Sequence, residues 1–175
     1  MSAPIEIRLD ELRQLFDALD PAPFRERDLD PRADEFVVES ARELPAGTAP
    51  ALRVHLAHGA VEAAAAAEVE ASVRQHYARR AAVERRRLRD LFRTGRISLA
   101  IGLAFVAVAL AFAEWVAPLI LSELAASVAV DSFVIGAWVA LWRPLEIFLY
   151  DWWPIRAEAR LYERLAAMPL ALAAG

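Results

Sequence analysis

Two apolar runs of membrane length constrain the fold of this chain more than any other feature. The first, ISLAIGLAFVAVALAFAEWVAPLIL at residues 97–121, carries one charge, Glu114. The second, SFVIGAWVALWRPLEIFLY at residues 132–150, is interrupted by Arg143, Pro144 and Glu146. The hydrocarbon core of a bilayer is about 30 Å thick and a helix of about 20 residues crosses it, so each run is long enough to span. Because only a short segment separates the runs, the sequence predicts a hairpin of two transmembrane helices.

Arginine placement predicts how this hairpin is oriented. Residues 79–96, RRAAVERRRLRDLFRTGR, are dense in arginine, and three more arginines follow the second run at positions 156, 160 and 164. The loop between the runs holds Glu123 and Asp131 but no arginine. By the positive-inside rule, we expect both termini in the cytoplasm and the loop outside. A nucleic-acid patch is a weaker interpretation of the arginine run, because the run adjoins an apolar span and the net charge is -4.

The N-terminal residues predict a small α+β domain. The segment MSAPIEIRLDE lacks a basic start followed by an apolar core, so we expect no cleaved signal, and the first apolar run should act as an internal anchor. Residues 5–9 and 51–57 alternate apolar and polar side chains, the period of half-buried strands. Between them, apolar spacing predicts helices at 10–19 and from a cap at Asp30 to 44. This βααβ domain is too small to bury a sufficient core by itself. We therefore expect it to pack against a neighbouring subunit, the following helix or the membrane.

From Val61 the composition favours one long helix. The segment is rich in Ala, Glu and Arg, and the next proline is Pro118. We therefore expect an uninterrupted helix from about residue 61 to about residue 121, which extends from the membrane into the cytoplasm. A thin coiled-coil-like stripe runs along it, but His76, Arg80 and Arg87 on that stripe favour a loose bundle, or packing on the same chain, over a tight zipper.

Aromatic residues gather around the end of the second run. Four of them, Trp142, Tyr150, Trp152 and Trp153, are candidate anchors at the headgroup level. Asp131 is a candidate cap for the second span, and Pro154 could begin a C-terminal amphipathic helix, followed by a short strand or a tail. The resulting division is a cytoplasmic domain 1–58, a stalk 59–96, a first span 97–121, an external loop 122–131, a second span 132–150 and a cytoplasmic C-terminal segment 151–175.

Ionisable residues within the spans are the main candidates for function. Arg143 and Glu146 are three apart, and pairing with each other near the headgroups is favoured over a pore or relay role. Glu114 is expected at the interface, although an oligomer could assemble it into a ring of carboxylates. His58 and Glu62 are spaced for a metal but lack a third ligand, so we expect no metal and no cofactor. The chain has no cysteine, no glycine-rich phosphate loop and no hydrolase motif, so no catalytic residue is predicted.

Two stretches carry a resemblance to a known family. PFRERDLDPRADEF at residues 23–36 and ALWRPLEIFLYDWWPI at residues 140–155 resemble signature stretches of uncharacterised bacterial membrane proteins with two predicted spans. The resemblance implies no activity. It does imply specific contacts at 142–154 and at a loop that contains Phe24, Arg25, Arg27, Asp28 and Asp30.

These observations and the resemblance favour a non-enzymatic, homo-oligomeric scaffold or interaction module in the bacterial inner (cytoplasmic) membrane. The expected partners are the lipid bilayer and further copies of the chain; we expect no nucleic acid. The alternative is a small oligomeric ion channel or transport subunit lined by Glu114, Arg143 or Glu146. A lipid-processing or metal-dependent enzyme is a third class, for which the sequence shows no catalytic set.

Overall fold

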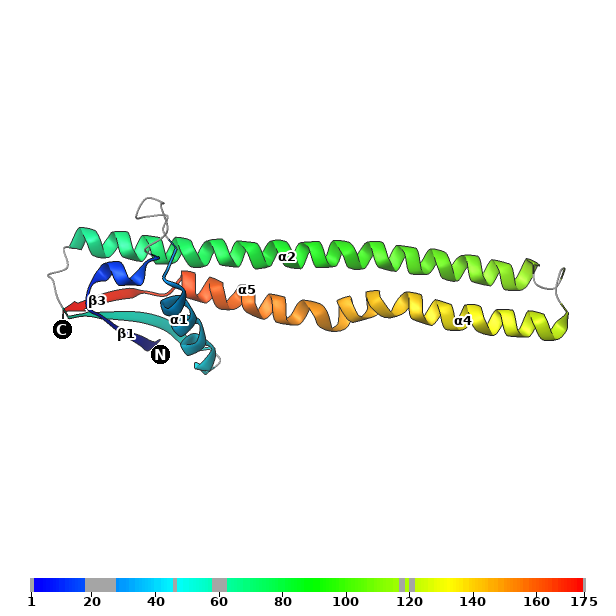
Figure 1. The fold of residues 1–175 in the computed structure, drawn as a ribbon, viewed down its shortest axis with the longest axis horizontal. Coiled ribbons are helices and arrows are strands. Elements are labelled where there is room, and N and C mark those ends of the chain that lie inside the picture. Colours follow the sequence, from blue (N-terminus) through cyan, green and yellow to red (C-terminus); the bar gives the residue numbers. More distant parts are fainter. Residues whose placement is uncertain are drawn as a thin grey trace. The chain divides into compact units, whose positions relative to one another are not determined.

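The computed structural model of the chain describes residues 2–17, 28–45, 47–57, 63–116, 119 and 122–174. Its secondary structure is mostly helical, with a small sheet, which confirms the mostly α fold class (Figure 1). Two compact units can be distinguished. One combines Met1–Glu84 with Ala157–Gly175, and the other is Arg85–Arg156.

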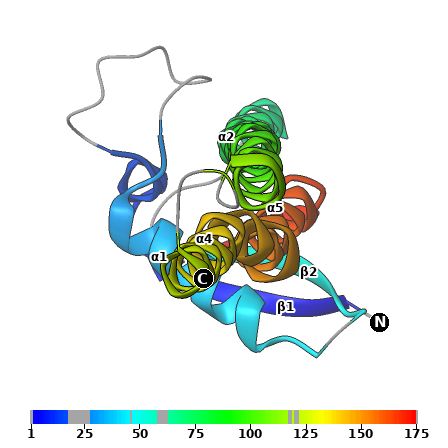
Figure 2. The same cartoon turned by 90° about the vertical axis from the view of Figure 1, so that its right-hand side faces the viewer.

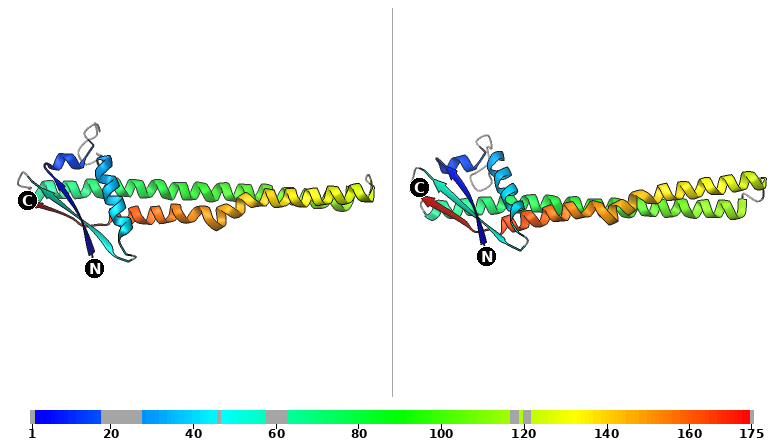
Figure 3. Two further views of the ribbon diagram at one scale, coloured as in Figure 1. Left: turned by 60° about the horizontal axis from the view of Figure 1, so that its bottom comes forward. Right: turned by 90° about the horizontal axis from the view of Figure 1, so that it is seen from below.

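The first unit contains a three-stranded sheet in which all strands are parallel. Strands β1 (Ser2–Leu9), β2 (Ala49–Leu56) and β3 (Leu170–Ala174) lie in the order β1-β2-β3. Ile5 pairs with Leu52, and Leu52 pairs with Leu170, so β2 is central. The three arrows point the same way in both views of Figure 3. The C-terminal residues, for which the sequence left a strand or a tail open, therefore form an edge strand.

Parallel strands require crossover connections, and these determine how the chain is arranged. A 3-10 helix η1 (Leu12–Leu15) and helix α1 (Pro31–Glu43) connect β1 to β2. All the long helices lie in the second crossover, between β2 and β3. The compact unit therefore extends beyond the predicted domain of residues 1–58, because its third strand comes from the other end of the chain.

The helix predicted at residues 10–19 is wrong over the part that the structure describes. Only the single turn Leu12–Leu15 forms, and Phe16 makes an antiparallel bridge with Leu29. The Asp17 N–H donates to the Asp28 carbonyl at 2.9 Å, and the Asp30 N–H donates to the Leu15 carbonyl at 3.0 Å. These pairings replace the helical hydrogen bonds and bring Leu15 and Phe16 into the core; residues 18–20 lie outside the described part.

One face of the sheet carries the core, and the other is polar. The side chains of α1, α2, α5 and η1 cover the inner face, and the cluster includes Ile5, Leu15, Val37, Leu52, Val54, Val69, Tyr77 and Leu165. On the outer face Arg53 donates to Glu6 at 3.3 Å. A parallel sheet usually has both faces covered, so this polar face is an unusual feature of the unit.

The second unit, Arg85–Arg156, is formed by two long helical segments whose outer parts belong to the first unit. Helix α2 (Ala63–Ala111) runs without a break and is followed by a π-helix η2 (Phe112–Val116). Helix α4 (Glu123–Glu146) leads through a π-helix η3 (Ile147–Asp151) into α5 (Trp152–Ala166). α4 begins within the loop predicted at 122–131, so that loop and the cap at Asp131 were wrong. Ser122 is the cap: its hydroxyl accepts from the Ala125 N–H at 3.4 Å, and the residues after it are good helix formers.

Small residues allow α2 and α4 to approach closely, as Figure 2 shows end-on. Gly95, Gly102 and Ala109 are buried at intervals of seven along α2. A Cβ at Gly95 would lie 2.8 Å from Cγ2 of Ile147, and one at Gly102 would lie 3.1 Å from the Ala140 carbonyl oxygen. A strict seven-residue repeat is typical of left-handed, nearly antiparallel packing of two helices.

Candidate functional site

The contacts between α2 and α4 show which residues of the two helices lie at the same level. Gly95 faces Ile147, and Gly102 faces Ala140 and Leu141. The rings of Phe112 and Phe133 are tilted against each other, with their centroids 5.0 Å apart. Because the helices are antiparallel, residue numbers rise along one helix in the direction in which they fall along the other. Arg143 and Glu146 therefore lie level with residues 96–99, at the start of the first apolar run rather than in its middle.

The helix that holds the second apolar run is longer than the run itself. Helix α4 begins at Glu123, before the predicted start of the second span at residue 132, and the contacts at Gly95 and Gly102 set residues 126–145 against residues 97–116. Those 20 residues would reach about 30 Å as a helix, the thickness of a hydrocarbon core. The charged residues 143–151 then lie beside the arginine-rich part of α2.

Arg143 is held by two carboxylates across the π-helix. Its Nη1 lies 3.1 Å from Glu146 Oε2 and 3.1 Å from Asp151 Oδ2. Trp142 Nε1 donates to Glu146 Oε1 at 2.8 Å. Pro144 lacks an N–H and displaces the preceding turn, and the wider η3 turn follows at once. The predicted pair of Arg143 with Glu146 is thus extended to Asp151, which the sequence spacing of eight residues did not indicate.

The aromatic residues surround this network. Tyr150, Trp153 and Trp142 are 70%, 65% and 57% exposed. Trp152 is less exposed: its Nε1 donates to the Phe148 carbonyl at 2.9 Å, and the Arg156 guanidinium lies 5.5 Å above its ring. Three of the four predicted anchors therefore present free aromatic surface, and Trp152 supports the helix itself.

Glu114 lies far from this network along the chain. It is exposed within η2, next to Trp115, which is 69% exposed. The level relation places it with the start of α4, at the opposite end of the apolar stretch from Arg143.

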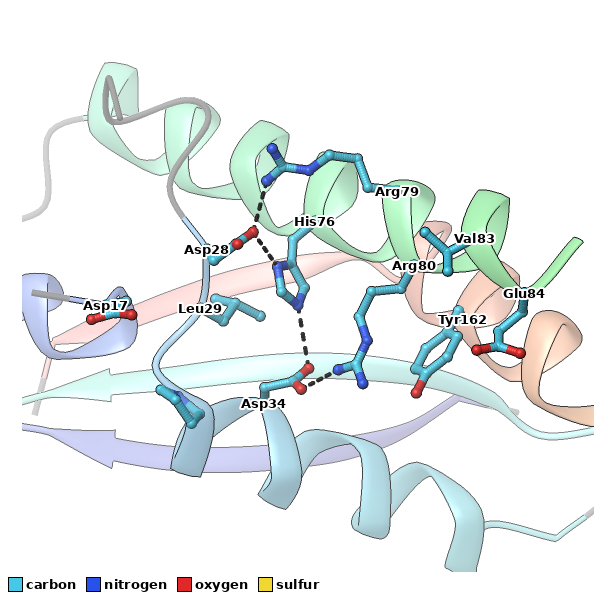
Figure 4. A pocket seen from close by; sticks show the side chains of 11 residues that line it. Asp17, Asp28, Leu29, Asp34, His76, Arg79, Arg80, Val83, Glu84 and Tyr162 are labelled. Carbon is cyan, nitrogen blue, oxygen red and sulfur yellow. Dashed lines mark hydrogen bonds and ion pairs between the residues drawn. The ribbon is translucent and has the colours of Figure 1, made fainter. Parts of the chain in front are cut away.

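A second charged cluster lies in the first unit, around a pocket of about 690 Å³ (Figure 4). His76 of α2 stands between two carboxylates. Its Nδ1 is 3.1 Å from Asp28 Oδ1, and its Nε2 is 3.4 Å from Asp34 Oδ1. Arg79 donates to Asp28 at 2.9 Å, and Arg80 donates to Asp34. These contacts fix the segment before α1, and α1 itself, to helix α2.

The electrostatics of this cluster favour the ionised carboxylate of Asp34. Burial alone would raise the pKa of Asp34, but the hydrogen bond to His76 and the charge of Arg80 hold it below its ordinary value. Burial, together with the nearby Asp34 charge, raises the pKa of the Tyr77 phenol well above its ordinary range. Arg80 also lies 4.5 Å above the Tyr162 ring, and burial with the hydrogen bond to Glu158 raises the pKa of Tyr162 to about 12.

The predicted contact loop divides between two roles. Asp28 belongs to the His76 cluster, whereas Asp30 caps α1 and accepts from the Arg32 N–H at 2.9 Å. Phe24, Arg25 and Arg27 lie outside the described residues. The stripe on α2 was a candidate for packing in a bundle or on the same chain. As far as residue 81 this side of α2 packs on the sheet of the same chain, where Val69, Val73 and Tyr77 are buried.

The histidines do not assemble a metal site in the part of the chain that the structure describes. His55 lies on the outer sheet face, 3.7 Å from Glu6, and His58 with Glu62 is outside that part. The cluster around His76 was not predicted, because its two aspartates come from a loop and a helix about fifty residues away in sequence. Asp34 lies four residues after the cap of α1, and nothing in the neighbouring sequence indicated that it would pair with His76 and Arg80.

No protein-family model, curated protein or solved structure matches this chain. Its function is therefore inferred from its own residues and their geometry.

Proposed function

We propose that this chain is an integral protein of the bacterial inner membrane that acts as a homo-oligomeric scaffold. In this proposal α2 and α4 cross the bilayer, and the first unit lies in the cytoplasm with both termini. The mechanism is assembly, in which the hairpin holds the small sheet domain at the membrane and neighbouring copies associate.

The apolar side chains that the structure leaves exposed carry this proposal. On α2, Ile101 is 66% and Val108 is 67% exposed, and on α4, Leu124 is 78% and Val139 is 71% exposed. Both helices are long and apolar enough to cross a membrane, yet only 11% and 0% of their most apolar windows are buried. A monomeric soluble protein rarely exposes so large an apolar surface, whereas a bilayer covers it without cost.

The position of the hairpin within the sheet crossover supports a scaffold. β2 and β3 are hydrogen-bonded neighbours, and both apolar stretches lie between them in the chain. The cytoplasmic ends of both spans are therefore tied to one sheet, which resists separation of the helices. Side chains such as Ile135 and Trp138 remain 65% and 67% exposed on α4 and are available to helices of other copies.

Two measurements test the proposal. Full-length protein expressed in bacteria should stay with membranes after a carbonate wash, and cysteines placed at Ala3 and Ala174 should both be labelled only from the cytoplasmic side. Native mass spectrometry in a mild detergent should then show one defined number of copies. Release by carbonate or labelling from opposite sides would disprove the membrane topology; a strictly monomeric protein would disprove the scaffold.

A channel is the second candidate, and exposed Glu114 within a π-helix favours it, because such turns recur at functional sites. Arg143 is already paired with Glu146 and Asp151, which supports a structural role for it. A channel would give ion flux in proteoliposomes that Glu114→Gln reduces, whereas a scaffold would give none.

A further inference from the structure

Four arginines form one charged face on α2 next to the first apolar stretch. Arg86, Arg89, Arg93 and Arg96 are spaced by three, four and three residues, which places them on one side of a helix. All four are exposed. Among the described residues no acidic side chain pairs with any of them, in contrast to Arg79, Arg80 and Arg143. We call this set the arginine face.

The arginine face lies at the level of the aromatic anchors. Since Gly95 faces Ile147, Arg96 is level with Glu146, and Arg93 and Arg89 are level with Tyr150 and Trp153. Exposed Trp and Tyr mark the headgroup layer of a bilayer. At this level Glu146 and Asp151 share the single charge of Arg143, and Asp90 adds one more carboxylate, so two net negative charges stand against the four arginines. The surface at this level therefore carries an uncompensated positive charge beside free aromatic rings.

We propose that the arginine face is a binding site for the phosphates of anionic phospholipids in the cytoplasmic leaflet. The inference rests on the proposed membrane insertion, which brings the headgroups to residues 86–96. Guanidinium groups bind phosphate through paired N–H donors, and a polybasic segment beside a span is typical of recognition of anionic lipid. Carboxylates of a second copy are the competing occupant, but insertion brings a leaflet to this face in every copy, whether assembled or not.

Distance from the apolar boundary predicts unequal contributions along the face. Arg96 directly precedes the apolar run, and Arg86 lies ten residues, or about 15 Å, further away. The headgroup layer is only about 5–7 Å thick on each side, and charges in water are screened over about 8 Å. Arg96 and Arg93 should therefore contact phosphate directly, whereas Arg86 should contribute least.

Competitive lipid binding to full-length protein tests the site. The protein in neutral detergent is given equal amounts of phosphatidylglycerol and phosphatidylcholine, and native mass spectrometry counts the lipids retained. Wild type should prefer phosphatidylglycerol, and the preference should fall by up to about fivefold for each arginine removed. The variant R86Q/R89Q/R93Q/R96Q should lose it, R96Q alone should lose more than R86Q alone, and added NaCl should weaken it in wild type.

A matched control separates the site from net charge. The variant R8Q/R13Q/R32Q/R160Q removes four exposed arginines of the first unit and should keep the lipid preference. Equal lipid preference in both variants, or none in wild type, would overturn the inference. So would a change in copy number with unaltered lipid preference, which would assign the face to a second copy. Carbonate resistance of wild type is read separately, so failure of membrane insertion is distinguishable from failure of the lipid site.

Discussion

Replacement of Asp34 by Asn should loosen α1 from α2 without removing any packing volume. The Asp34 side chain is only 17% exposed and contacts both Arg80 and His76. A hydrogen bond to a charged group contributes about 1.5–3 kcal/mol, and the 37% exposure of the Arg80 side chain reduces this by solvent screening. The amide keeps one weaker contact, so the expected loss is about 2 kcal/mol in the opening free energy of α1.

Hydrogen exchange of the α1 peptide Pro31–Glu43 measures this loss in the full-length protein. Local opening governs exchange, and about 2 kcal/mol corresponds to roughly thirtyfold faster exchange. Glu39→Gln is the matched control, because Glu39 is exposed on the same helix. The double variant with Arg80→Gln should cost less than the sum of the singles by about 1 kcal/mol. Equal exchange in Asp34→Asn and Glu39→Gln would refute the argument.

Acid should reproduce the effect in wild type. The pKa of folded Asp34 is depressed by His76 and Arg80 against the opposing effect of burial, so below the unfolded pKa of about 3.9 the unfolded chain binds more protons than the folded one. The stability from Asp34 is therefore present above about pH 4 and is lost as pH falls through the lower folded pKa. After correction for intrinsic exchange, wild type should lose α1 protection over that range. Asp34→Asn should lack the part of this acid-induced loss that comes from protonation of Asp34.

Three further substitutions and one control test the packing. Gly102→Leu should lower the thermal stability of the hairpin in detergent by about 1–3 kcal/mol, because a Cβ there already lies 2.9 Å from Leu141 and 3.1 Å from a backbone oxygen; Gly136→Ala, whose Cβ meets only Phe105 at 3.3 Å, should change it little. Tyr77→Phe should leave the protection of β2 from hydrogen exchange unchanged or raise it by about 1 kcal/mol, because the buried Tyr77 hydroxyl has no hydrogen-bond partner among the described residues. A clear loss of that protection would show that the hydroxyl does have a partner. Leu172→Asp should cost about 2 kcal/mol and speed exchange in β2, since Leu172 pairs with Val54 on the core face; unaltered exchange would mean that β3 adds little to the sheet.

Local patterns in the sequence predicted the elements that local physics controls. Alternation indicated β1 and β2, Asp30 with Pro31 indicated the start of α1, and helix formers indicated α2. Pairing across the chain was not predictable in the same way. β3 is five residues of Leu and Ala with weak strand preference, and it forms because β2 offers an open parallel edge. The His76 cluster likewise depends on a loop that only the tertiary fold brings to α2.

The level of Arg143 shows why the place of a residue along a helix pair cannot be assigned from one apolar run. Sequence alone placed Arg143 inside a span, because apolar residues lie on both sides of it. The structure instead ties the level of Arg143 to α2 through Gly95 and Gly102. At both positions α4 comes so close that a Cβ on α2 would clash with it. Sliding α4 by one turn would set Ile147 and Ala140 against larger side chains of α2. The small residues therefore place Arg143 and Glu146 at the level of residues 96–99 and Asp151 at the level of about residue 91.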